Sequence, residues 1–212
     1  MILGDRHKRA EVVSEAQMKQ TFEQIDRDAT NAAVRAGLQA WLDKDFNKAR
    51  TLLEGPAAAG EPRAMTTLAI MYLGGSGFPK DEARGVQLLR GAADKGDSDA
   101  QFYLGRMYNN KRGQFGIAND YEKSVHYLAL AAAQGHPEAK YYLGLDYELG
   151  RGIAKDAIKA ARLCEEAAVA NVPGAQYHLA LLYHDGMGVE QDQAKAAEWI
   201  AKAKANGYDG ES

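Results

Sequence analysis

The sequence has little that would support a disulfide framework, nucleic-acid binding or a membrane span. Its single cysteine, Cys164, excludes an internal disulfide and cannot form a zinc site by itself. The 26 basic and 29 acidic side chains nearly cancel, so no cationic excess is present for nucleic acid. The longest apolar run, near Leu128 to Ala133, is far too short to cross a bilayer. We therefore expect a soluble protein that neither binds nucleic acid nor inserts into a membrane.

The first residues also lack the features of a secretory signal. Met1, Ile2 and Leu3 lead almost directly into the charged stretch 5–9, which leaves no room for an apolar signal-peptide core. As written, the chain is expected to be cytoplasmic, and it would be periplasmic if an export signal has been removed. The compartment stays open.

No set of residues with catalytic or metal-binding spacing is visible. His178 and His184 are six residues apart, which turns them away from each other on a helix. His184 and Asp185 are better read as a polar groove wall than as a catalytic dyad, and His136, next to a turn glycine, is expected to be solvated. The glycine pairs follow no strand and precede no Lys-Ser/Thr, so phosphate binding is disfavoured. We predict a protein without catalytic residues, metal or cofactor.

Self-similarity along the chain is the strongest signal that the sequence does contain. Four windows share an alanine, a leucine four residues later and a tyrosine four residues after that. The leucines Leu68, Leu104, Leu143 and Leu179 are separated by 36, 39 and 36 residues. A repeat of this length is typical of stacked helix pairs.

Turn and capping residues recur in the same register. A glycine-containing turn follows each tyrosine, and an aspartate suited to cap a second helix follows the turn. Fifteen residues later comes Gly or Asn, which tolerate the left-handed conformation that ends a helix. The aspartates are Asp81, Asp120, Asp156 and Asp192, and the later positions are Gly96, Gly135, Asn171 and Gly207. Asp45 and Gly60 keep the same interval, which predicts a degenerate first repeat over residues 28–63.

The second helices carry aligned apolar positions, so each must bury one face against a neighbour. Three- and four-residue steps place these positions on one helical stripe. Cys164 falls in a column otherwise filled by Leu53, Leu89, Leu128 and Ile200, which predicts a buried, unreactive thiol. Because one helix pair cannot bury its stripe alone, the units are expected to stack.

The pattern Ala-x3-Leu-Gly-x2-Tyr-x2-Gly-x-Gly, then Asp, then Ala-Ala-x2-Gly resembles the Sel-one-like repeat family, a relative of the tetratricopeptide repeat. Residues 139–175 match it best, and the match covers about residues 64–207 as four repeats. We predict an all-α, right-handed superhelical solenoid of about five helix-turn-helix repeats. The resemblance implies a non-catalytic scaffold that binds a partner protein or peptide.

The resemblance also places a groove. In tetratricopeptide-like superhelices the first helix of each pair lines the concave surface, at positions two before, two after and five after the repeated leucine. Carried over, the predicted partner-binding residues are Thr66, Ile70, Phe102, Arg106, Asn109, Tyr141, Leu145, Glu148, Tyr177, Leu181 and His184. The rings of Phe102, Tyr141 and Tyr177 suit a binding surface, although they could instead fill space between adjacent repeats.

The expected partner is an apolar helix or an extended segment, because the groove carries one arginine among largely apolar neighbours. Bacterial relatives of this type imply adaptors, regulators or envelope-associated binders. The alternative is an immunity protein that neutralises a toxin or effector enzyme.

The two ends of the chain are expected to differ. Residues 1–27 are predicted to form a capping helix with the apolar positions Met18, Phe22 and Ile25, which could alternatively be exchanged between subunits or mask the groove. Residues 208–212 are a tail without a further helix. This leaves a stacking surface, so the chain is expected to be a monomer or to associate weakly end to end.

Overall fold

The computed structural model describes residues 30–111 and 115–208, and this part of the chain contains helices and no strand. Residues 30–42 are helical and are followed by α2 (Phe46–Ala58) and α3 (Pro62–Gly74). The remaining helices are α4 (Glu82–Asp94), α5 (Ser98–Tyr108), α6 (Tyr121–Ala133), α7 (Pro137–Leu149), α8 (Ala157–Val169), α9 (Pro173–Asp185) and α10 (Gln193–Ala205). None of the described helices is both long and apolar enough to cross a bilayer.

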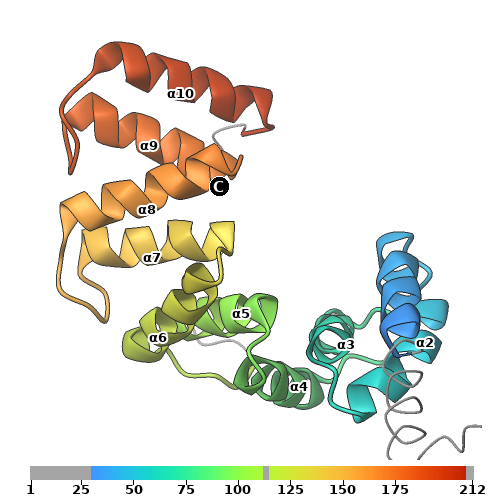
Figure 1. Ribbon diagram of the computed structural model, residues 1–212. Coiled ribbons are helices and arrows are strands. Elements are labelled where there is room, and N and C mark those ends of the chain that lie inside the picture. Colours follow the sequence, from blue (N-terminus) through green and yellow to red (C-terminus); the bar gives the residue numbers. More distant parts are fainter. Residues whose placement is uncertain (1–29, 112–114, 209–212) are drawn as a thin grey trace, which may run out of the picture.

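The helices follow one another along a single curved arc from α2 to α10 (Figure 1). Each helix packs mainly against the helices before and after it, most extensively within the pairs α3 and α4, α5 and α6, α7 and α8, and α9 and α10. This arrangement confirms the predicted all-α helical solenoid. Stability in such a fold comes from contacts between neighbouring units.

The predicted aspartate caps are confirmed at every second helix. In each case the carboxylate accepts a hydrogen bond from the backbone N–H three residues later, at 2.9 to 3.1 Å. The capping residues are Asp45, Asp81, Asp120, Asp156 and Asp192. A cap of this kind satisfies one of the amide groups that a helix leaves unpaired at its start.

The glycines of the turns serve two purposes. Gly75, Gly150 and Gly186 end first helices with φ near 70°, the left-handed conformation that glycine adopts without strain. The second glycine of the turn lets neighbouring units approach closely. A Cβ added at Gly188 would collide with the backbone carbonyl of Ala157, the first residue of α8.

Buried apolar residues form a series of clusters along the arc rather than one central core. The cluster around α8 and α9 contains Cys164, which is 1% exposed and donates its thiol to the backbone oxygen of Ala175 at 3.3 Å. Burial raises the pKa of this thiol to about 12. The prediction of a buried cysteine is confirmed.

The predicted capping helix at residues 1–27 lies outside the described residues. The degenerate first repeat at 28–63 coincides with a helix pair formed by residues 30–42 and α2. Its buried residues, among them Val34 and Leu53, share a cluster with Leu68 of α3. This pair therefore packs on the solenoid as the later units do.

Candidate partner-binding groove

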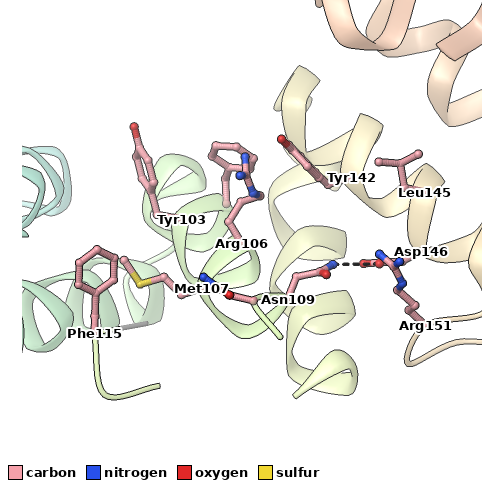
Figure 2. A pocket seen from close by; sticks show the side chains of 11 residues that line it. Tyr103, Arg106, Met107, Asn109, Phe115, Tyr142, Leu145, Asp146 and Arg151 are labelled. Atoms are coloured by element: carbon pink, nitrogen blue, oxygen red, sulfur yellow. Dashed lines mark hydrogen bonds between the residues drawn. The ribbon is translucent and has the colours of Figure 1, made fainter. Parts of the chain in front are cut away.

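Two adjoining cavities lie along the first helices of the units. The larger, of about 430 Å³, lies between α5 and α7, and Figure 2 shows the side chains that line it. The smaller, of about 390 Å³, is bounded by residues 38–42, α3, α5 and the start of α7. Phe102 and Tyr103 line both cavities. The two therefore form one discontinuous groove along residues 38–42, α3, α5 and α7.

The groove brings together some of the predicted residues and leaves out others. Phe102, Arg106, Asn109 and Leu145 line the larger cavity, and Thr66, Ile70 and Phe102 line the smaller one. Thr66 is only 4% exposed, so it offers little surface to a partner. The remaining predicted residues, Tyr141, Glu148, Tyr177, Leu181 and His184, line neither of these two cavities.

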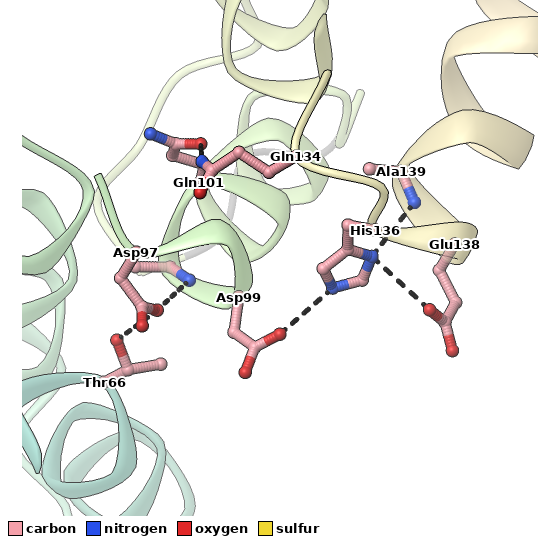
Figure 3. Close-up of polar contacts among 9 residues, drawn as sticks. Thr66, Asp97, Asp99, Gln101, Gln134, His136, Glu138 and Ala139 are labelled. Atoms are coloured by element: carbon pink, nitrogen blue, oxygen red, sulfur yellow. Dashed lines mark hydrogen bonds and ion pairs between the residues drawn. The ribbon is translucent and has the colours of Figure 1, made fainter. Parts of the chain in front are cut away.

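Three of the four side chains two residues before the repeated leucines contact a residue that follows the second helix of their own pair. The Thr66 hydroxyl donates to Asp97 at 2.8 Å (Figure 3), and the Phe102 ring stacks on His136 with the ring centroids 4.5 Å apart. Tyr177 stacks on Tyr208 at the same centroid distance. Because Asp97 and His136 cap α5 and α7, Thr66 and Phe102 help to join adjacent helix pairs, and the role of these side chains in partner binding stays a prediction.

His136 is not solvated as expected. Its side chain is 10% exposed, and its Nδ1 accepts the backbone N–H of Ala139 at 3.3 Å, which caps α7. Its Nε2 lies 3.2 Å from a carboxylate oxygen of Asp99 in α5, where the contact lowers the pKa of that carboxyl (Figure 3). The prediction was wrong because it considered only the adjacent turn glycine, whereas Asp99 and Phe102 of α5 cover the ring.

Sequence reasoning missed Tyr103 and Tyr142, which line the larger cavity one position after the predicted aromatic column. One residue rotates a side chain by about 100° around a helix, so Tyr142 lines the larger cavity although Tyr141 does not. The guanidinium of Arg106 lies 4.1 Å from the ring centroid of Tyr142, a cation–π contact that holds both at the rim. Two adjacent aromatic residues in α5 and again in α7 were the available signal.

Asp146 was also missed, and it is the least expected residue of the groove. It lines the larger cavity although it is 0% exposed, and burial raises the pKa of its carboxyl to about 6. Its Oδ1 accepts a hydrogen bond from the Asn109 side-chain amide at 3.0 Å, while its Oδ2 has no hydrogen-bond partner among the described residues. The corresponding positions in the other units are Met71, Met107 and Leu182. An aspartate in an otherwise apolar column was a readable signal.

Two other histidines, His178 and His184, each pair with one carboxylate. His178 Nε2 in α9 lies 2.6 Å from Oε2 of Glu148 in α7, in the preceding helix pair. His184 Nδ1 lies 2.7 Å from Oδ1 of the neighbouring Asp185 at the exposed end of α9. Within the described residues no group of three or more His, Cys, Asp or Glu side chains could hold a metal ion. The groove thus offers aromatic surface, the three arginines Arg63, Arg106 and Arg151, two exposed carboxylates and the buried Asp146.

Comparison with protein-family models finds the Sel1 repeat over residues 62–97, 98–136, 137–170 and 173–208. From here on, the first to fourth repeats are these four matched segments, and the degenerate unit at residues 28–63 precedes the first of them. The match accounts for more than half of the chain and agrees with the intervals read from the leucines. Comparison with curated protein sequences finds no match.

Several solved structures have a similar fold. A Sel1 repeat protein from Oxalobacter formigenes is 28% identical with a TM-score of 0.72, over 82% of this chain and 70% of that one. A protective antigen of uropathogenic Escherichia coli that displays an SLR fold is 26% identical with the same TM-score, over 90% of this chain and 41% of that one. A Klebsiella pneumoniae protein described as a Sel1 repeat protein is 22% identical with a TM-score of 0.57, over 90% and 93%, and shares the fold.

Proposed function

Because this chain belongs to the Sel1 repeat family, whose members generally mediate protein–protein interactions, we propose that it is an adaptor that holds a partner protein or peptide in the groove along residues 38–42, α3, α5 and α7. The family is a generally non-catalytic scaffold. The bacterial origin of the similar structures supports a bacterial adaptor.

The observation that carries this proposal is that the two cavities adjoin. They share Phe102 and Tyr103, so one extended segment could cross from the first repeat to the third without leaving the surface. Aromatic and arginine side chains dominate the binding energy of many protein interfaces, and Arg106 and Tyr142 stand at the rim. The mixed charge of the lining, with Arg63, Arg106, Asp99 and Glu138, favours a partner of mixed character over a polyanion.

A selection from displayed random peptides tests the groove, with binding of the selected peptides measured on two charge-reversal variants. Arg106→Glu alters an exposed side chain that lines the groove, whereas Arg162→Glu makes the same change on α8, where the side chain is 66% exposed. We expect Arg106→Glu to weaken binding at least about tenfold and Arg162→Glu to leave it within about twofold. Equal binding to both variants would show that the peptides occupy another surface.

A further inference from the structure

The charged groups that an occupant of the larger cavity can touch are both cationic. Arg106 belongs to α5 and is exposed, and Arg151 belongs to the turn between α7 and α8 and is partly exposed (Figure 2). Neither guanidinium forms a hydrogen bond or an ion pair with another of the described residues. The expectation of an apolar partner counted one arginine, because it did not assign the turn that supplies Arg151 to the groove.

Aromatic rings position the guanidinium of Arg106 before any ligand binds. Its central carbon lies 4.1 Å from the ring centroid of Tyr142 and 6.0 Å from that of Phe102. A guanidinium that rests on a ring still presents N–H groups along its edge, and these match the two oxygens of a carboxylate. Because the side chain is already placed, it loses less freedom when a carboxylate binds.

Asp146 supplies the opposing charge of this cavity, but an occupant cannot touch it. The residue is 0% exposed and accepts its hydrogen bond from Asn109. The two guanidinium groups outnumber this one carboxylate even when it is ionised. The cavity therefore attracts an anion more than a cation.

The smaller cavity lacks this excess of positive charge. Arg63 and the titratable His136 lie there with Asp99 and Glu138, whose side chains are 58% and 50% exposed. An acidic group therefore finds more favourable surroundings between α5 and α7 than in the smaller cavity. The formal charge of −3 on the whole chain opposes a polyanion such as nucleic acid. This pattern favours a single acidic group.

The uncharged lining decides what accompanies the acidic group. Phe102, Tyr103, Tyr142 and Leu145 form apolar walls around a volume of about 430 Å³, which lies within the range of ligand pockets. That volume admits an acidic side chain together with an apolar neighbour. Apolar walls also exclude water, which strengthens a hydrogen bond between charged groups.

We propose that the cavity between α5 and α7 receives an aspartate or glutamate side chain of a partner peptide. Its carboxylate pairs with Arg106 and Arg151, and an adjacent apolar or aromatic side chain packs against Tyr103 and Leu145. This inference rests on the proposed adaptor function and adds the chemistry of one anchor residue. Arginine is one of the residues that carry much of the binding energy at protein interfaces.

Small fragments test the cavity without a peptide. We would titrate the full chain at pH 7.5 with 3-phenylpropionate, which joins a ring to a carboxylate, and follow the Asn109 side-chain amide by NMR because it lines the cavity. 3-Phenylpropionamide is the neutral analogue of the same shape, and 3-phenylpropylamine is the cationic one. The carboxylate is expected to bind about tenfold more tightly than the amide, as one charge-assisted hydrogen bond implies. The amine should bind more weakly than the amide.

Three variants assign this preference to the charges of the cavity. Arg151→Gln is expected to reduce the preference for the carboxylate from about tenfold to about threefold, whereas Asp146→Asn removes the opposing charge and should raise it about threefold. Arg162→Gln is the matched control on α8, where the side chain is 66% exposed and lies outside both cavities. It should keep the full preference.

Displayed random peptides extend the test to the proposed kind of partner. Peptides selected on the wild type are expected to carry Asp or Glu beside an apolar residue. Replacing that acid with Asn or Gln should weaken binding to the wild type about tenfold, and binding to Arg151→Gln less than about threefold. Such non-additive losses identify two groups that interact.

Equal affinity of the wild type for 3-phenylpropionate and its amide would overturn the proposal, as would a preference that Arg151→Gln leaves intact. Failure of 3-phenylpropionate to bind, together with selected peptides that lack an acidic residue, would do the same. Each of these results leaves the adaptor function standing if peptide binding still falls with Arg106→Glu. Conversely, peptides that ignore Arg106→Glu beside a persistent preference for 3-phenylpropionate would reject the adaptor function and leave a site for small anions.

Discussion

The contact between the second and third repeats differs from the contact between the third and fourth, although the same helix positions build both. Asn109 and Glu148 occupy equivalent positions five residues after the repeated leucine. Asn109 bonds to the buried Asp146 beside a cavity, whereas Glu148 bonds to His178, with both side chains partly buried. The position equivalent to Asp146 in the fourth repeat is the buried Leu182. One contact is therefore open and polar at its floor, and the other is filled.

The difference indicates that the solenoid does not distribute stability evenly. An apolar residue at the floor gains burial energy, whereas a buried carboxylate loses solvation that one amide only partly replaces. Natural proteins keep such costly groups mainly where they serve function. The open contact is thus the better candidate for binding, and the filled contact the better candidate for holding the fold together.

The largest change in the free energy of unfolding is expected when the open contact is made to resemble the filled one. Asp146→Leu is expected to raise the free energy of unfolding at pH 7.5 more than it does at pH 4. The increase at pH 7.5 should exceed the increase at pH 4 by about 2–3 kcal/mol. The carboxyl pKa is raised from 3.8 to about 6. The folded state therefore binds this proton more tightly than the unfolded state. The stability that this bound proton contributes is fully present below pH 4 and is lost as the pH rises through 6.

Urea titrations of the wild type and Asp146→Leu at both pH values measure the effect as a difference. The pH dependence that other carboxylates give to the stability cancels in this difference, because both proteins contain them. Asp185→Asn, which removes an exposed carboxylate, is the control and should show no pH-dependent difference of this size. A pH-independent effect of Asp146→Leu would show that the carboxyl is not desolvated.

Removing the ring of Phe102 should weaken the contact between the second and third repeats. The side chain is half-buried and packs on His136 and Tyr142, so Phe102→Ala is expected to cost about 2 kcal/mol, less than a fully buried phenylalanine. Thermal or urea unfolding measures the loss, and Phe102→Leu, which keeps apolar volume, should recover about half of it. If Phe102→Ala unfolds like the wild type, the aromatic column serves the groove alone and not the contact between repeats.

A smaller effect is expected when the filled contact is broken. His178 and Glu148 are 18% and 22% exposed, so His178→Ala should cost about 1 kcal/mol. His184→Ala offers a matched control in the same helix, because the pair of His184 and Asp185 is mostly exposed and should contribute less than about 0.5 kcal/mol. Equal costs for the two variants would mean that the bridge between repeats adds nothing beyond a surface ion pair.

The parts of the fold that sequence reasoning predicted are those that depend on nearby residues. An aspartate caps the helix that begins beside it, and a glycine or Asn171 ends a helix because its own backbone is left-handed. The interval between the repeated leucines then aligns the units in the sequence, whatever their orientation in the fold. These requirements are local, and they recur in every unit. A single sequence therefore shows each of them several times.

The site was predicted less well because it depends on contacts between units. The partner of Asp146 is Asn109, which lies 37 residues away, and His136 is covered by Asp99 and Phe102 of α5, more than 30 residues earlier. The positions carried over from a related superhelix omit Tyr103 and Tyr142, which follow Phe102 and Tyr141 by one residue. The rotation of each helix about its axis decides which of two neighbouring side chains faces a cavity, and it is set by side-chain packing across the repeat boundary.

Cys164 allows the filled contact to be followed directly, with the smallest change in global stability. The thiol is buried against Ala175 of α9, and burial raises its pKa to about 12, so a thiol reagent at pH 8 should modify it only when this contact opens. His178→Ala removes about 1 kcal/mol from that contact and should speed labelling about fivefold, because the rate follows the opening equilibrium. Asp146→Leu alters the preceding contact and should leave the rate within about twofold. Rapid labelling of the wild type in native buffer would contradict the buried position, and equal acceleration or slowing by both variants would show that the two contacts open together as one cooperative unit.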